Sequence, residues 1–353
     1  MINYDIKVKV AAVQSEPVWF DPTATVDKAI RIIQEAAANG AKLVGFPELY
    51  VSGYPWWVQV YSPVTTGNRF YKKLYASTMQ FGDANMKKLM HAARENHIYV
   101  VMGYSELSGG SCYMSQVFIS DTGEILANRR KLKPSYAERM LYGEGDGSDM
   151  LVVDTPIGRI GGLNCWEHYQ PLEKYVMAAL HEQIHIASWP SHNVYQPSFP
   201  DTIESNKMAT IVYACETQTF VIASTTLIGK AGQDAWKLSD ELREKLPCGG
   251  GWASIYAPDG TELTTEQAIP EDQEGIVYAD IDLTDIEYCK INRDAVGQYS
   301  RPDIFTLQVN ASRNHHVVIS GDPREELRNS LGAVNAEFLC ECEKSEKNIN
   351  VKQ

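Results

Sequence analysis

The sequence predicts an α/β protein in which helices cover mainly β layers. Segments with helical spacing of apolar residues alternate with short buried strands, as in the unit formed by residues 6–46. The middle of the chain then changes to paired strands, which are joined by the turn sequences Asp121-Thr122-Gly123 and Thr155-Pro156-Ile157-Gly158. Crossovers mixed with hairpins favour sheets whose outer faces are covered by helices.

The first unit already indicates where a site would lie. Residues 6–14 are rich in β-branched and small apolar residues, and they predict a strand. Residues 26–37 repeat apolar side chains at helical spacing, and residues 42–46 form a short buried strand. Glu48 therefore follows the C-terminal end of a strand, where open α/β sheets place their ligands.

The later elements repeat these patterns. In chain order we expect a helix over 86–97, strands over 98–103, 112–120, 125–128, 150–154 and 159–163, a helix over 172–182, a strand over 184–189, a helix over 203–216, a strand over 220–225, and a hairpin from 252–257 to residue 262 and beyond. From about residue 310 the apolar pattern weakens. We expect a domain over 1–310 and a C-terminal tail over 311–353 that is flexible or mediates assembly.

Composition excludes several classes of protein. The 353 residues carry 45 acidic and 32 basic side chains, a net charge of -13, which argues against nucleic-acid binding. No stretch reaches the roughly 18 to 20 apolar residues that span a bilayer, and residues 1–13 alternate charged and apolar side chains. The seven cysteines are odd in number and thinly spread, unlike a secreted disulfide framework. We expect a cytoplasmic protein with mostly reduced thiols and no membrane partner.

Cys165 is the strongest candidate nucleophile. The apolar run 160–164 leads to Cys165-Trp166-Glu167-His168 and then to a helix, and a strand–turn–helix junction exposes a side chain near free backbone N–H groups. The alternative is a buried structural cysteine. We expect His168 to be a structural residue, because a partner three positions away on a turn tends to point elsewhere.

His181-Glu182 and His185 match the spacing of a zinc-binding HExxH motif. That motif needs one continuous helix, whereas residues 184–189 alternate as a strand. We therefore predict no metal site here.

The segment 129–147 combines several charges with apolar residues, so we expect some of its charges to be buried and paired.

Three segments together resemble the nitrilase superfamily: Gly45–Glu48, Arg130–Pro134 and Gly162–His168. Their order and spacing match the Glu-Lys-Cys triad of that superfamily, here Glu48, Lys131 and Cys165. The run after the cysteine and the segment 142–147 are similar to the nitrilase branch. The resemblance implies a four-layer α-β-β-α sandwich and dimers, joined through the helical outer layers, that can extend into spiral filaments.

The resemblance also implies a mechanism without metal or organic cofactor. Cys165 would attack a nitrile carbon, Glu48 would serve as general base, and Lys131 would stabilise the developing anion together with the backbone N–H of Trp166. Glu138 matches the fourth carboxylate of the family and would orient Lys131. The alternative for Glu138 is a plain salt-bridge partner.

Aromatic residues near the candidate site predict a flat apolar pocket. The expected substrate-binding residues are Tyr54, Trp57, Trp166, Trp189 and His192. The alternative for Trp56 and Trp57 is that they are core or interface aromatics. Segments 103–106, 108–111 and 181–190 resemble arylacetonitrilases, although Asn164 is more like other nitrilases.

The resulting expectation is hydrolysis of an arylacetonitrile to the acid and ammonia. Alternatives are an aliphatic or cyanide-hydrolysing enzyme, an amidase or carbamoylase of the same superfamily, and a non-catalytic protein that forms filaments.

Overall fold

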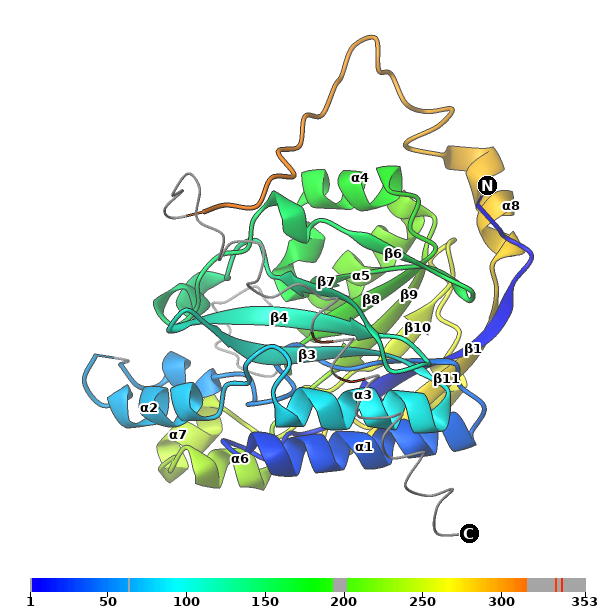
Figure 1. Ribbon diagram of the computed structural model, residues 1–353. Helices are drawn as coiled ribbons and strands as arrows, with labels where there is room; N and C mark the ends of the chain where they lie inside the picture. The colour runs from blue at the N-terminus through cyan, green and yellow to red at the C-terminus, as the bar shows by residue number, and fades with distance from the viewer. Residues whose placement is uncertain (1, 63, 193–201, 316–333, 335–337, 339–353) are drawn as a thin grey trace.

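The computed structural model describes residues 2–62, 64–192 and 202–315, together with Val334 and Phe338 (Figure 1). Its strands are β1 Lys7–Gln14, β2 Leu43–Gly45, β3 Tyr99–Ser108, β4 Ser111–Ile119, β5 Ile125–Arg130, β6 Val152–Thr155, β7 Gly158–Asn164, β8 Ile184–Trp189, β9 Phe220–Thr225, β10 Ser254–Tyr256 and β11 Gly275–Asp282. Its α-helices are α1 Pro22–Ala38, α2 Asn68–Ala76, α3 Ala84–Asn96, α4 Pro171–Ala179, α5 Ile203–Thr217, α6 Lys230–Ala235, α7 Asp240–Lys245 and α8 Thr284–Arg293. The 3-10 helices are η1 Trp56–Gln59, η2 Tyr136–Met140, η3 Gly147–Asp149, η4 Cys165–Tyr169 and η5 Thr265–Gln267.

The strands form two packed layers. Their order is β5-β4-β3-β2-β1-β9-β8-β7-β6, with β11 paired to β1 and β10 paired to β9. The link between β1 and β9 rests on one residue pair, Gln14 with Thr225. Val10 and Val101 of the first layer share a buried cluster with Ile186 of the second. The core therefore lies between the layers.

Helices cover both outer faces (Figure 1). Leu89 of α3 packs with Val44 of β2 in one buried cluster, which also contains residues of α1. Met177 of α4 packs with Leu163 of β7 in another, which includes residues of α5. The layers follow the order α-β-β-α, and the predicted four-layer sandwich is confirmed.

Strand β1 explains why the central strands are apolar on both faces. Ala11 and Val13 lie in the cluster with α1 and α3, whereas Val8, Val10 and Ala12 lie in the cluster between the two layers. Successive side chains of a strand point to opposite faces, so a strand buried on both faces has no polar alternation.

The hairpin predicted after residue 252 is confirmed in a short form. Tyr256 forms an antiparallel bridge with Glu262, and the backbone N–H of Leu263 donates to the carbonyl oxygen of Ile255 at 2.8 Å. On its other edge strand β10 pairs antiparallel with β9. The next strand, β11, pairs antiparallel with β1 along its whole length. The pairing runs from Lys7 opposite Asp282 to Gln14 opposite Gly275.

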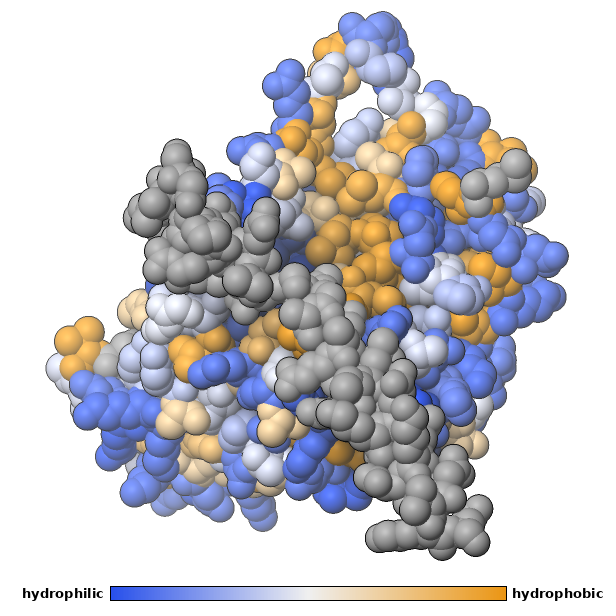
Figure 2. Space-filling model, in the orientation of Figure 1, coloured by the Kyte–Doolittle hydropathy of each residue, from blue (hydrophilic) through white to orange (hydrophobic). Residues whose placement is uncertain are grey.

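After α8 the chain forms an exposed arm over 294–315, which arches above α4 in Figure 1. The backbone N–H of Asn314 donates to Asp146 at 2.7 Å. Figure 2 shows hydrophobic surface beneath this arm, and a pocket of about 280 Å³ there is lined by residues that include Tyr175, Leu307 and Val309.

Two residues of the predicted tail pack against the body. The Phe338 ring is fully buried and lies 4.7 Å from the His91 ring, and Val334 packs against the same apolar cluster. Apart from residues 311–315, the rest of the predicted tail is outside the described residues.

No described helix combines the length and the apolar character that crossing a membrane would require. None of the five cysteines that the structure describes, Cys112, Cys165, Cys215, Cys248 and Cys289, forms a disulfide bond.

Candidate active site

Three strands bring the predicted triad to one edge of the sandwich. Glu48 follows β2, Lys131 follows β5 and Cys165 follows β7. Strands β2 and β3 are parallel, and β5 runs parallel to β3 because two antiparallel pairings separate them. The second layer is joined in parallel to the first through β9. All three strands therefore end on the same side.

Lys131 forms two ion pairs inside the site. Its Nζ lies 2.8 Å from Glu48 Oε1 and 2.8 Å from Glu138 Oε2. Tyr54 donates its hydroxyl proton to Glu138 Oε1 at 2.6 Å. The three charged side chains are at most 2% exposed, so one cation is shared by two buried carboxylates.

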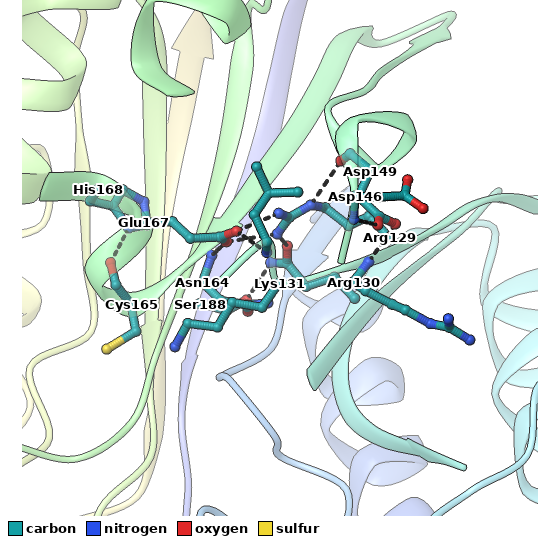
Figure 3. Close-up of polar contacts among 12 residues, drawn as sticks. Arg129, Arg130, Lys131, Asp146, Asp149, Asn164, Cys165, Glu167, His168 and Ser188 are labelled. Carbon is teal, nitrogen blue, oxygen red and sulfur yellow. Dashed lines mark hydrogen bonds and ion pairs between the residues drawn. The ribbon is translucent and has the colours of Figure 1, made fainter. Parts of the chain in front are cut away.

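Cys165 completes this cluster. The ligand atoms of Glu48, Glu138 and Cys165 all lie within 4.8 Å of one another. Figure 3 shows the Cys165 sulfur and the Lys131 amine pointing toward the same space. Glu48 Oε2 is buried and has no hydrogen-bond partner among the described residues, so this oxygen can accept a proton from the thiol or from water.

Burial and charge set the protonation of the site. Burial raises the pKa of Glu48 to about 8, against the opposing charge of Lys131. Burial disfavours the charged form of Lys131, but Glu138 and Glu48 outweigh it and hold the Lys131 pKa well above its usual range. Glu48 can therefore exchange a proton near neutral pH while Lys131 stays positive.

The three ligand atoms lie close enough together to hold a metal ion, but Lys131 already forms ion pairs with both carboxylates. A divalent cation would have to displace its ammonium group. We therefore assign no metal role to this cluster.

The backbone at Cys165 has the predicted elbow shape. Cys165 has φ of +50°, in the left-handed region, and it lies between β7 and η4. This conformation is unfavourable for a residue with a Cβ by roughly 1–2 kcal/mol, so the surroundings must hold it.

Glu167 fixes the elbow relative to the lysine segment (Figure 3). Its carboxylate accepts two hydrogen bonds from Arg129, at 2.9 and 2.8 Å. It also accepts the backbone N–H of Asn164 at 2.7 Å and that of Leu132 at 2.8 Å. One buried carboxylate thus joins the residue before Cys165 to the residue after Lys131.

The expected buried charges of segment 129–147 are confirmed. Besides the Arg129–Glu167 pair, Arg130 pairs with Glu106, whose side chain is 4% exposed.

The HExxH spacing does not form a helix. His181 is exposed, whereas His185 lies in β8 and is fully buried. The prediction of a strand at this position is confirmed, and the two histidines do not converge.

Aromatic side chains form a row beside the charged cluster. The ring of Tyr54 lies 4.5 Å from that of Trp56, Trp56 lies 6.1 Å from His192, and His192 lies 5.7 Å from Trp189. Burial, aided by the charge of Lys131, lowers the pKa of His192 to about 3, so this ring is neutral. The row is therefore uncharged.

The other expected substrate residues belong to the same apolar clusters as this row: Trp57 to that of Tyr54 and Trp56, and Trp166 to that of Trp189. Trp57 is fully buried and packs 5.7 Å from Phe70, in the cluster under α2. Trp166 is half-buried and packs beside the cluster that contains Cys165. Asn193, which follows His192, is outside the described residues.

Sequence reasoning missed two supports of the site. It did not pair Glu167 with Arg129, and it did not connect His168 to His185, whose Nε2 atoms lie 2.9 Å apart. The sequence does contain one signal for such supports. A charged or polar residue in an otherwise apolar strand needs a buried partner, so it indicates that a hydrogen bond or ion pair is present.

Residues 9–291 match the family model of the carbon-nitrogen hydrolases. The chain belongs to this family. It is 48% identical to an aliphatic nitrilase of Rhodococcus rhodochrous, over 95% of this chain and 88% of that one. It is 42% identical to an arylacetonitrilase of Aspergillus kawachii, over 88% and 94%, and 40% identical to a bromoxynil-specific nitrilase of Klebsiella pneumoniae subsp. ozaenae, over 98% and 95%. It is an enzyme of the nitrilase branch.

Solved structures share the fold at low identity. The NitFhit protein of C. elegans superposes with a TM-score of 0.67 at 16% identity, covering 89% of this chain and 70% of that one. A mutant amidase from Nesterenkonia sp. AN1 in complex with butyramide gives 0.59 at 16% identity, covering 82% and 96%. The carbon-nitrogen hydrolase thus has the sandwich of its superfamily.

Proposed function

We propose that the enzyme hydrolyses an organic nitrile to a carboxylic acid and ammonia, with Cys165 as nucleophile. The observation that carries this proposal is the Lys131 ammonium between Glu48 and Glu138 beside the Cys165 thiol. The relatives named as nitrilases support the same class of substrate.

The first step forms a carbon–sulfur bond. Glu48 takes the thiol proton through its unpartnered oxygen, the sulfur attacks the nitrile carbon, and the proton passes to the nitrogen to give a thioimidate. Lys131, together with the backbone N–H of Trp166, stabilises the negative charge that develops on nitrogen. Glu138 holds Lys131 in place and is itself held by Tyr54.

Water completes the reaction in two steps. A first water adds to the thioimidate, Glu48 transfers a proton from this water to the nitrogen, and the tetrahedral species expels ammonia to leave a thioester. A second water cleaves the thioester, which releases the acid and restores the thiol. Expulsion of sulfur in place of ammonia from the same species would release an amide.

Activity assays separate this proposal from its alternatives within the superfamily. We expect ammonia release from a nitrile to exceed that from the matched amide. Faster turnover of the amide would favour an amidase, and faster turnover of cyanide than of organic nitriles would favour a cyanide-hydrolysing enzyme.

For the substrate, we propose an aromatic ring one carbon away from the cyano group. The row Tyr54, Trp56, His192 and Trp189 supplies flat neutral walls. A short aliphatic nitrile is the second candidate, because the relative with 48% identity is an aliphatic nitrilase. Trp57 and Trp166 remain expected substrate contacts.

We predict that phenylacetonitrile has a higher kcat/KM than butyronitrile. Ring burial against these walls stabilises the complex by roughly 1.5 to 3 kcal/mol, a factor of about ten to a hundred. Trp56→Leu should reduce kcat/KM for phenylacetonitrile about tenfold and leave butyronitrile almost unchanged. If butyronitrile is preferred by the unaltered enzyme, the aliphatic candidate is correct.

We also propose a homodimer joined through the α4–α5 face. This outer layer exposes large apolar side chains, namely Tyr169, Leu172, Tyr175, Met208 and Val212. Apolar surface of this kind is typical of interfaces between subunits. Further contacts that do not close would extend the dimers into a spiral filament. A cytoplasmic location is part of the same proposal, supported by the free thiols.

We predict that Leu172→Glu combined with Met208→Glu converts the assembly to monomers in light scattering. Each side chain is 59% exposed, so a charge there is tolerated in a monomer and unfavourable in a dry interface. The control is Ile291→Glu on α8, which is 72% exposed and should keep the assembly. An unchanged assembly in the double variant would refute this interface.

A further inference from the structure

A chain of buried polar side chains extends from the nucleophile into the helical layer. His168 Nδ1 lies 2.7 Å from the carbonyl oxygen of Cys165, and His168 Nε2 lies 2.9 Å from His185 Nε2. His185 Nδ1 lies 2.8 Å from Glu182 Oε1, and Tyr213 donates its hydroxyl proton to Glu182 Oε2 at 2.6 Å. The mechanism above uses none of the four side chains.

The ends of this chain determine where its hydrogens lie. The Cys165 carbonyl can only accept, so His168 must carry a proton on Nδ1, and its Nε2 in the neutral ring is an acceptor. His185 must then donate from Nε2. The contact between Glu182 and His185 therefore needs one shared proton, on the carboxyl group or on His185 Nδ1.

Loss of that proton removes one hydrogen bond from this chain of side chains. With Glu182 ionised and both rings neutral, His185 would donate from Nδ1 to the carboxylate. Either the two Nε2 lone pairs would then face each other, or a bare His168 Nδ1 would face the Cys165 carbonyl. Both arrangements are repulsive at the observed separations.

The carbonyl held by His168 belongs to the peptide group of Cys165 and Trp166. No cis peptide bond occurs among the described residues, and in a trans peptide the C=O and N–H bonds point in opposite directions. Fixing the carbonyl on one side therefore aims the Trp166 N–H toward the other.

We propose that His168, His185, Glu182 and Tyr213 are positioning residues whose single shared proton aims the Trp166 N–H at the reacting nitrogen. This inference rests on the proposed function, because it assigns a role within the same Cys165 chemistry. The four residues act through the peptide group and do not touch the substrate.

The packing around Glu182 is built for a carboxyl group. A Cβ at Gly161 of β7 would lie 2.1 Å from Glu182 Oε1, so the absence of a side chain at Gly161 leaves room for the Glu182 carboxyl group. The side chains of Glu182 and His185 are 0% exposed.

The electrostatics favour a retained proton. Burial raises the pKa of Glu182 to about 8, against the opposing effects of Tyr213 of α5 and Arg129 of β5. Burial also holds the pKa values of His168 and His185 well below the usual range; for His185, Arg129 adds to this and Glu167 opposes it. Both histidine rings are therefore neutral, and Glu182 carries the shared proton.

Two variants separate positioning from bulk packing. Glu182→Gln places an N–H donor toward His185 and an acceptor toward Tyr213, as the protonated acid does. We expect it to keep kcat within about threefold of the unaltered enzyme at pH 7. His185→Phe interrupts the hydrogen bonds between His168 and Glu182. We expect kcat to fall roughly tenfold to a hundredfold while KM stays within about threefold of that of the unaltered enzyme, because the Trp166 N–H no longer points at the reacting nitrogen.

The pH profile provides the second readout. The unaltered enzyme loses the shared proton as pH rises through about 8, whereas the amide introduced by Glu182→Gln cannot lose one. The ratio of kcat for Glu182→Gln to that of the unaltered enzyme should be flat below pH 7 and rise above pH 8. His181→Asn, an exposed neighbour outside the chain, should leave kcat and the profile unchanged.

Two results of these assays would contradict the proposal. A constant ratio across pH, or a loss of kcat in Glu182→Gln as large as in His185→Phe, would overturn the proposal. The assays use whichever nitrile or amide the unaltered enzyme turns over, so a wrong substrate class does not affect them. Solid-state NMR of protein labelled with ¹⁵N-histidine needs no turnover: His168, assigned by its loss in His168→Asn, should be protonated at Nδ1 only, and an Nε2–H tautomer would also overturn the proposal.

Discussion

Replacing Cys165 with alanine is expected to lower nitrile turnover by about five orders of magnitude or more, because no covalent intermediate can form. The substitution removes one sulfur atom from a side chain that is 3% exposed, so the melting temperature should change little. Ammonia release under saturating substrate gives the rate, and a thermal melt verifies the fold.

Cys248→Ala is the matched control for this prediction. Cys248 is also a free thiol, but it is exposed and lies far along the chain from η4. Its loss should leave turnover unchanged. Normal ammonia release by a folded Cys165→Ala protein would exclude the proposed nucleophile.

Lys131→Ala is expected to lower turnover by about three orders of magnitude or more, since the members of a catalytic group act together. It also leaves Glu48 and Glu138 as two buried carboxylates without their shared cation. Breaking a buried ion pair in this way destabilises a protein by about 3–5 kcal/mol unless a carboxylate takes up a proton. The melting temperature should therefore fall together with kcat.

The neighbouring Lys133 provides the control. It lies two residues away, its side chain is 57% exposed, and it pairs with Glu144 at the surface. Lys133→Ala should keep both turnover and stability, because exposed ion pairs contribute little. A Lys131→Ala enzyme with near-normal kcat would mean that another group supplies the positive charge.

Several strands near the site could be predicted from the sequence because their signals are local. Residues 42–46 form an apolar run that ends at Pro47, and residues 184–189 alternate as a strand although they overlap a zinc-like spacing. The structure has strands at both places. Short apolar runs next to turn residues are sufficient for predictions of this kind.

Pairings across the sandwich were not readable in the same way. Strand β11 alternates clearly, with Val277, Ala279 and Ile281 buried, but its partner β1 lies at the other end of the chain. The bond from Glu167 to Arg129 likewise depends on how two layers pack. A single sequence indicates that such residues need partners, but it does not identify which residues the partners are.

The central claim is that a nitrile is hydrolysed through a covalent bond to Cys165. Rapid-quench mass spectrometry of the enzyme with phenylacetonitrile tests it most directly. We expect an adduct on the peptide containing Cys165, with the mass of the nitrile or of its acyl group, that forms and decays at the rate of turnover and is absent in Cys165→Ala. Turnover at the same rate with no adduct on Cys165, or with the adduct on another cysteine, would contradict the claim.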